Sequence, residues 1–188
     1  MPKIVDHDAR RLELLEQSFD LFADRGYSAV SMRQLAGELG VSTGTLYHYF
    51  PNKPALFEAM LRSLAVSDVE TALSSLDSGM GLQGRLAMIQ AYVSAEADHI
   101  KQILWVTIDY QRTVGVAAYT LIKDVLDVYH TAISDHLCEG DREQASILIS
   151  YIIGVLVHRG LVPSGFDLGL QINGLATLAS SQETYICA

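Results

Sequence analysis

The sequence predicts an all-α fold, with a small N-terminal three-helix domain built around a helix-turn-helix and a larger C-terminal helical domain. Apolar residues recur at intervals of three and four along nearly the whole chain, and no segment sustains the alternation that is typical of a β-strand. Capping residues, glycines and a proline-containing break divide this periodicity into short and long helices. With 188 residues and 49% apolar content, the chain can bury a substantial core.

The first helix is expected over residues 8–25. Leu12, Leu15, Phe19 and Phe22 are spaced by 3, 4 and 3 residues, so they are predicted to share one buried face. Gly26 follows directly, and it is interpreted as a left-handed cap that ends the helix.

Two short helices come next. Ser31 and Gln34 form a capping-box pattern in front of an apolar face made of Met32, Leu35, Ala36 and Leu39. Gly40 ends this helix, and Ser42 is positioned to cap a third helix that runs to about Phe50. Two short helices joined by a glycine-containing turn indicate a helix-turn-helix.

A break at residues 51–54 precedes the fourth helix, with Asn52 as its expected cap and Pro54 in the tolerated first turn. Its inward side chains are predicted to be Phe57, Met60, Leu61 and Leu64. After a loop at 77–81, which separates the head from the larger body, further helices are expected over 82–97, 98–112, 116–137, 142–159 and 167–180.

Within the third helix, a rotation of about 100° per residue separates an inner and an outer face. Leu46 and Phe50 point inward on this projection. The outer face consists of Gly44, Thr45, Tyr47 and His48. Small and polar side chains on a short exposed helix favour close contact with a polar partner.

Residues 42–53, read as STGTLYHYFPNK and preceded by MRQLA at 32–36, resemble the DNA-binding signature of the TetR family of transcription regulators. The resemblance implies a recognition helix in the major groove, with flanking groups on phosphates. It implies base contacts from Thr43, Gly44, Thr45 and His48. It implies phosphate contacts from Tyr47, Lys53 and the helix N-terminus at Ser31, with Arg33 as either a DNA contact or a solvated charge. As an alternative to DNA contact, Tyr47 and Tyr49 could cover the three-helix core, and His48 could be a solvated surface residue. The sequence departs from the family pattern at Pro54, where an acidic residue is common, and in the few Lys and Arg of its head.

The same resemblance implies a helix-turn-helix domain over residues 1–53 and a helical effector-binding and dimerisation domain over 54–188. Residues 142–159 are apolar nearly all round, and with 167–180 they favour a four-helix interface between two subunits; an intramolecular core is the alternative. Aromatic, apolar and polar side chains in the central segment are the candidate lining of a small-molecule site: Met88, Tyr92, Trp105, Asp109, Tyr110, Arg112 and Tyr119.

The net charge of −9 is unevenly distributed, with −1 over residues 1–62 and −8 over residues 63–188. A near-neutral head still binds DNA if its basic side chains share one face. The apolar run at 147–157 is interrupted by polar residues and is interpreted as a buried helix rather than a membrane span, and the polar N-terminus argues against a secretory signal. Cys138 and Cys187 are expected to be unreactive, as in a reducing cytoplasm.

These observations predict a cytoplasmic, homodimeric regulator, a repressor that a small-molecule effector releases from double-stranded operator DNA. It is expected to have no enzymatic activity, metal or cofactor. Two alternatives of other classes remain. One is a helical-bundle metalloenzyme that uses the carboxylate-x-x-His pairs Glu96/His99 and Asp127/His130, and the other is a scaffold for protein contacts.

Overall fold

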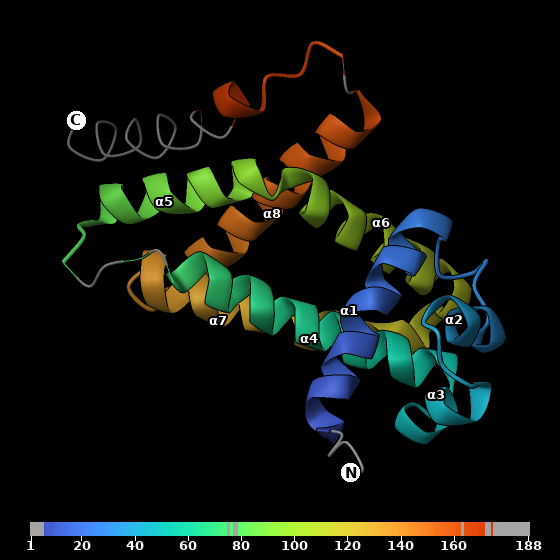
Figure 1. Cartoon of the computed structure of the whole chain (residues 1–188). Coiled ribbons are helices and arrows are strands. Elements are labelled where there is room, and N and C mark those ends of the chain that lie inside the picture. The colour runs from blue at the N-terminus through green and yellow to red at the C-terminus, as the bar shows by residue number, and fades with distance from the viewer. Residues whose placement is uncertain (1–5, 75, 77–78, 163, 172–173, 175–188) are drawn as a thin grey trace, which may run out of the picture. The chain divides into compact units, whose positions relative to one another are not determined.

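The computed structural model describes residues 6–74, 76, 79–162, 164–171 and 174, and within these ranges every regular element is helical (Figure 1). The elements are α1 (His7–Arg25), α2 (Met32–Glu38), α3 (Thr43–Tyr49), α4 (Lys53–Ser74), α5 (Leu82–Ala95), α6 (Ala97–Val114), the 3-10 turn η1 (Gly115–Ala117), α7 (Ala118–Leu137) and α8 (Arg142–Leu161). The predicted all-α fold is confirmed. The predicted helix over 167–180 is described only at its start, where residues 168–171 are helical, and its end lies outside the described residues.

The chain divides into two compact units. The first comprises residues 1–70 and 102–128, and the second comprises residues 71–101 and 129–188. Helices α4, α6 and α7 each begin in one unit and end in the other. A functional boundary between residues 53 and 54 stays a prediction.

The predicted helix starts are confirmed by their capping bonds. Ser31 and Gln34 form the complete capping box, in which the Gln34 amide donates to Ser31 Oγ at 3.3 Å and the Ser31 amide donates to Gln34 Oε1 at 2.9 Å. Ser42 Oγ accepts from the Thr45 amide at 2.9 Å, and Asn52 Oδ1 accepts from the Ala55 amide at 2.8 Å. Four local bonds between side chains and backbone amides therefore fix where α2, α3 and α4 begin.

The end of α1 differs in one respect from the prediction. Gly26 has the expected positive φ of 83°, but its ψ is 154°, so its conformation is not the left-handed helical one. This region of backbone space is essentially restricted to glycine. It directs the chain away from α1 into an extended turn instead of a tight left-handed cap.

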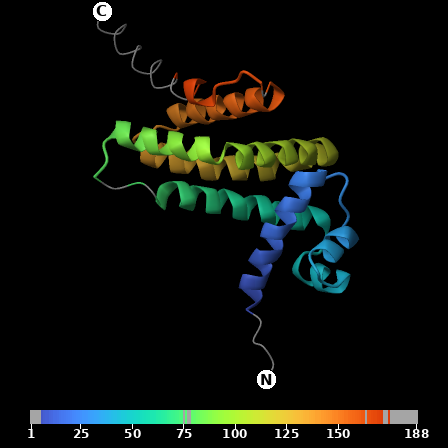
Figure 2. The ribbon, with the colours of Figure 1, turned by 45° about the horizontal axis from the view of Figure 1, so that its top comes forward.

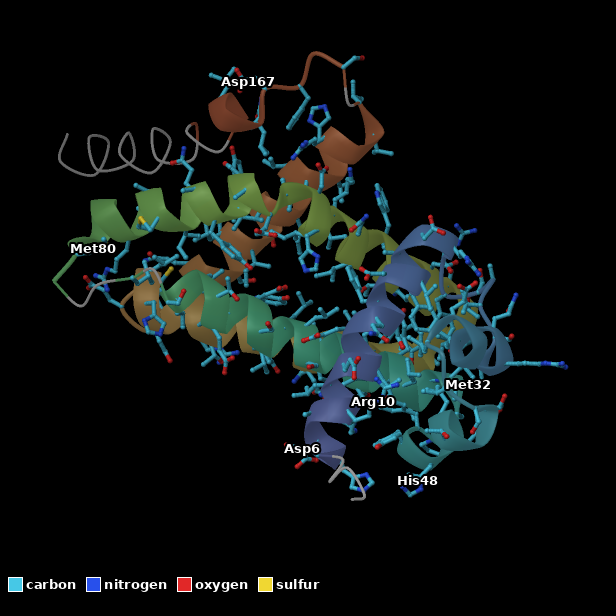
Figure 3. All side chains as sticks on the ribbon, in the orientation of Figure 1. Asp6, Arg10, Met32, His48, Met80 and Asp167 are labelled. Carbon is cyan, nitrogen blue, oxygen red and sulfur yellow. The ribbon has the colours of Figure 1, made fainter. Side chains whose placement is uncertain are left out.

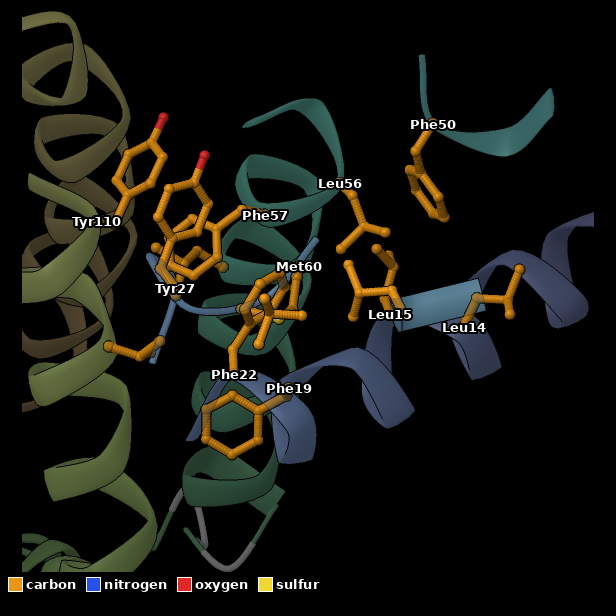
Figure 4. Close-up of a cluster of buried hydrophobic side chains, with 14 of the residues drawn as sticks. Leu14, Leu15, Phe19, Phe22, Tyr27, Phe50, Leu56, Phe57, Met60 and Tyr110 are labelled. Carbon is orange, nitrogen blue, oxygen red and sulfur yellow. The ribbon is translucent and has the colours of Figure 1, made fainter. Parts of the chain in front are cut away.

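The first unit encloses a core in which α2 and α3 lie beside α1 and the start of α4 (Figures 1 and 2). Leu15, Phe19 and Phe22 are buried as predicted, but Leu12 is 48% exposed, and the fully buried Leu14 takes its place. The periodicity is correct, but the buried face is rotated, because neighbouring helices and not spacing decide which side of an apolar stripe is covered. The rings of Phe22, Tyr27, Phe57 and Tyr110 form the aromatic centre of this core (Figure 4).

In the second unit, α8 buries only four side chains within the single chain: Ala145, Ile149, Val155 and Leu156. Ile147 is 62% exposed, so the predicted burial on more than one side is not reached in one subunit. In length and composition α8 resembles a membrane-spanning helix, but a single helix of this kind is weak evidence for a membrane span, because core helices of soluble proteins share these features. Charged and hydrogen-bonding groups connect it to other elements of the unit: Arg159 lies 3.5 Å from Asp98, and the Tyr151 hydroxyl donates to the Gln171 carbonyl oxygen.

Candidate nucleic-acid interface

The third helix presents a polar outer face, because the apolar side chains of its inner face are buried in the core and fix its orientation. Leu46 is 0% exposed and Phe50 is 1% exposed, as the sequence predicts. The outer side chains are all exposed: Thr43, Gly44, Thr45, Tyr47 and His48. No side chain stands between the Gly44 backbone and a partner, and the nearest atom to an added Cβ there would be Ser42 Oγ at 3.7 Å. The helix therefore offers a face that a duplex could approach closely.

The N-terminus of α3 is fixed through Thr45 as well as through its cap. The hydroxyls of Ser42 and Thr45 lie 2.8 Å apart, in addition to the bond between the Thr45 amide and Ser42 Oγ. The Thr45 side chain is thus held in one orientation while it remains exposed. A side chain that is already ordered suits a base-reading role, because less conformational entropy is lost on binding.

The second helix supplies a second N-terminus on the same unit. Ser31 caps it, and Arg33 is exposed in its first turn. At its other end, Glu38 accepts from Arg25 Nη2 at 2.9 Å, which connects α2 to the end of α1. Free amides and an exposed guanidinium at one helix start suit an anionic partner such as a phosphate.

Lys53 begins α4, and its ammonium is bonded inside the protein. Nζ donates to the carbonyl oxygens of Tyr27 and Val30 at 2.9 and 2.8 Å, and it lies 4.2 Å from the centroid of the Tyr27 ring. Burial lowers the pKa of Lys53, and the charge of Asp109 acts in the opposite direction. Two of the three ammonium N–H groups are engaged by these carbonyl oxygens, and a phosphate contact through the third stays a prediction.

Two residues of α1 lie beside α3 and were not predicted from the sequence. His7 Nδ1 is 3.1 Å from the Tyr49 hydroxyl, and the His7 and His48 ring centroids are 6.5 Å apart. Arg11 places its guanidinium carbon 5.2 Å from the centroid of the Phe50 ring. In Figure 3, His48 lies toward the same end of the unit as Asp6 at the start of α1. No local pattern indicates these contacts, because they join residues about forty positions apart.

Two of the candidate effector-binding residues are engaged in the first unit. The Asp109 carboxylate accepts from the Ser28 amide at 2.8 Å. Tyr110 is 1% exposed, and its hydroxyl donates to Glu58 Oε1 at 3.1 Å. Burial, with the charge of Glu58, raises the pKa of Tyr110 far above that of an ordinary tyrosine. Tyr110 has almost no surface left for a ligand, and Asp109 points to the turn after α1.

The other candidate effector-binding residues are divided between the two units. Met88 and Tyr92 are partly exposed on α5 in the second unit. Trp105, Arg112 and Tyr119 are exposed in the first unit. Their part in a ligand site stays a prediction.

The carboxylate and histidine pairs gain no third ligand. Within the part of the chain that the structure describes, no group of three or more His, Cys, Asp or Glu is placed to hold a metal. Asp127 accepts from Lys123 Nζ at 3.0 Å, which gives it an ordinary helix-surface ion pair. Burial and the charge of Asp141 raise the pKa of the Cys138 thiol, which disfavours the reactive thiolate at neutral pH. Cys187 lies outside the described residues.

Known proteins match the chain most clearly over its helix-turn-helix. Residues 14–60 match the model for bacterial regulatory proteins of the tetR family. The transcriptional repressor KstR2 of Rhodococcus jostii is 34% identical over 48% of this chain, and the match spans 45% of that protein, under half of its length. The transcriptional regulator BetI of Escherichia coli is 26% identical over 69% of this chain and 73% of its own length.

Solved structures share the fold over nearly the whole chain. FadR from Bacillus subtilis, in complex with stearoyl-CoA, has a TM-score of 0.73 at 18% identity and covers 89% of this chain and 96% of its own. A putative transcriptional regulator from Saccharomonospora viridis, in complex with choline, has a TM-score of 0.74 at 20% identity, covering 93% of this chain and 97% of its own. Residues 14–60, which contain the capped helix-turn-helix, are therefore similar to bacterial regulatory proteins of the tetR family, and the chain shares its all-helical fold with solved regulators.

Proposed function

We propose that this protein is a cytoplasmic, homodimeric transcription regulator that binds operator DNA through α3 and acts as a repressor released by a small-molecule effector. The observation that carries the proposal is the outer face of α3. It is exposed over its whole length, while Leu46 and Phe50 hold the helix rigidly to the core. A short, anchored helix with a polar face fits the major groove of B-DNA.

The contacts are divided by chemistry. Thr43, Thr45 and His48 carry the groups that hydrogen-bond base edges, and Gly44 permits close approach. The Tyr47 hydroxyl, Lys53, Arg33 and the amides at Ser31 are assigned to phosphates, which position the helix and carry no sequence information. Arg11 and His7 join this set because they lie against Phe50 and Tyr49 at the end of α3.

The homodimer rests on α8. Its exposed apolar side chains in a single chain include Ile147 at 62% and Leu161 at 67%, and a second copy of the helix would cover such a surface. Two heads related by twofold symmetry would read half-sites about one helical turn apart, roughly 34–36 Å. Light scattering should give twice 20.6 kDa, and a stable monomer at micromolar concentration would rule out the dimer.

The effector is proposed to be an apolar or amphipathic small molecule. Two proteins of the same fold were solved with stearoyl-CoA and with choline, so the fold accommodates small molecules of different chemistry. Binding linkage is reciprocal: an effector that lowers operator affinity is itself bound more weakly in the presence of operator, by the same factor. Stearoyl-CoA and choline are therefore suitable first probes in a DNA-release titration.

Fluorescence anisotropy with the DNA upstream of the protein's own gene, against a scrambled duplex of equal length, tests DNA binding. We expect the wild-type protein to bind the upstream duplex preferentially, and we expect this preference to be smaller in Thr45→Ala. The matched control is Thr120→Ala, an exposed threonine on α7, which should keep the wild-type preference. Equal binding to both duplexes by the wild-type protein would contradict the proposal. Metal analysis of the purified protein separately tests the metalloenzyme alternative.

A further inference from the structure

The turn between α1 and α2 is held from two sides by opposite charges. It runs from Gly26 to Val30 and leads directly to Ser31, the cap of α2. Lys53 donates to two carbonyl oxygens of this turn, those of Tyr27 and Val30. Asp109 of α6 accepts from the Ser28 amide at 2.8 Å, and its other oxygen lies 3.4 Å from the Ser28 hydroxyl.

The Gly26 backbone approaches Asp109 so closely that a side chain at position 26 would force the carboxylate to shift by a few tenths of an ångström. A Cβ added to Gly26 would lie 3.1 Å from Asp109 Oδ2, and the φ of +83° there already disfavours any other residue. The carboxylate is therefore seated against two consecutive parts of the turn, the Gly26 backbone and the Ser28 amide.

The residue that follows Asp109 fixes the position of α6 against the same turn. The Tyr110 ring stacks on Phe57, with centroids 4.5 Å apart, and meets the Tyr27 ring edge-on at 4.8 Å (Figure 4). The Tyr110 hydroxyl is bonded to Glu58. Because Tyr110 cannot shift without disturbing this ring cluster, the position of the Asp109 carboxylate is set by α6.

We propose that Asp109 is a positioning residue for DNA binding, whose carboxylate holds the α1–α2 turn in the conformation that sets the start of α2 and thereby the orientation of α3. The inference rests on the proposed DNA binding and adds a requirement to it. A residue of α6, far in sequence from the helix-turn-helix, determines how well that motif fits its operator.

General electrostatics and the proposed positioning role predict opposite effects on DNA binding when the Asp109 charge is removed. Deleting one carboxylate from a protein of net charge −9 should strengthen binding to any DNA, because it reduces repulsion from the phosphates. A carboxylate that positions the turn instead predicts weaker operator binding. The two effects differ in sign, so a single substitution separates them.

The variants are Asp109→Ala, Asp109→Asn and the matched control Asp20→Ala, which removes an equal charge from an exposed position on α1. Anisotropy gives the ratio of non-operator to operator Kd for each, with the upstream and scrambled duplexes. Asp109→Ala should lower this ratio roughly tenfold, the size expected for losing one hydrogen bond to a charged group. Asp109→Asn retains an acceptor oxygen and should therefore keep part of the wild-type ratio. Asp20→Ala should have the same ratio as the wild type.

A merely structural role would lower the folded fraction and weaken binding to both duplexes equally, leaving the ratio unchanged. Hydrogen exchange of the Ser28 amide gives an independent readout and should be faster in Asp109→Ala. A wild-type ratio in folded Asp109→Ala, or unchanged Ser28 exchange, overturns the inference alone. A wild-type protein without any preference for the upstream duplex overturns the proposed function, and the inference with it.

Discussion

Replacing Lys53 by alanine removes an ammonium with two structural contacts and one proposed DNA contact. Its bonds to the Tyr27 and Val30 carbonyl oxygens, 2.9 and 2.8 Å long, are charge-assisted but only part-buried. We assign about 1 kcal/mol to each bond, below the usual range of about 1.5–3 kcal/mol for charged groups, to allow for this solvent access. With about 0.5 kcal/mol for the cation over the Tyr27 ring, the free energy of unfolding should fall by about 2.5 kcal/mol.

The third N–H governs the effect on DNA binding. If it reaches a phosphate, Lys53→Ala lowers the slope of log K against log salt concentration by about 0.9 per subunit. Between 50 and 200 mM salt, this is about a threefold smaller loss of affinity per subunit. Loss of the phosphate contact should weaken binding to operator and non-operator DNA equally, because such a contact carries no sequence information. Any further loss of operator preference in this variant would come from the two bonds to the α1–α2 turn.

Anisotropy titrations at several salt concentrations measure the slope, and thermal melts identify the temperature range in which the variant is folded. Lys101→Ala is the matched control, because this lysine is paired with Asp98 at 2.8 Å in the second unit. It should keep the wild-type slope. A folded Lys53→Ala protein with the wild-type slope would refute the phosphate contact and leave the ammonium with its role in the turn. Wild-type stability would refute the contribution of its two hydrogen bonds.

Three further outcomes are expected. Leu46→Ala, at a position with 0% exposure, should lower the free energy of unfolding by about 2–5 kcal/mol in chemical denaturation, and a loss below 1 kcal/mol would contradict the anchoring of α3. The pKa values of Tyr27 and Tyr110 are raised, mainly by burial. Both tyrosines therefore stabilise the folded state below about pH 10, and this contribution is lost as the pH rises further. A titration followed by ultraviolet absorbance should detect tyrosines that ionise only as the protein unfolds, and the number of these tyrosines should be lower in Tyr110→Phe. Thr45→Ala should relax discrimination at one base pair per half-site by about 1 kcal/mol without changing the salt slope, as competition with single-substitution operators would show.

The helix boundaries and caps could be predicted because they depend on neighbours in sequence. Ser31, Ser42 and Asn52 each satisfy backbone amides within three residues, so local chemistry decides their role. The inner face of α3 was predictable for the same reason, since Leu46 and Phe50 are spaced by one helical turn. Leu12 shows the limit of this reasoning. Its spacing fits the apolar stripe, but the packing of other helices leaves it exposed.

Contacts between distant segments could not be predicted from the pattern. Lys53 and Asp109 are both charged residues for which a partner outside the chain, a phosphate or an effector, was the natural interpretation. The structure bonds both to one turn, 23 to 81 residues away in sequence. Nothing in the residues around Lys53 or Asp109 indicates this partner, because the turn offers only backbone groups, which every sequence possesses.

The charge of the protein determines which of these contacts should matter most for DNA binding. The net charge of −9 and the few cations near α3 leave little general attraction to phosphates. Operator preference must then depend on how accurately α3 is placed against base edges, since misplaced contacts cannot be compensated by non-specific affinity. Side chains that fix the helix, such as Leu46 and Asp109, should therefore alter operator preference more than the removal of a surface charge. In a strongly basic DNA-binding domain the order would be reversed.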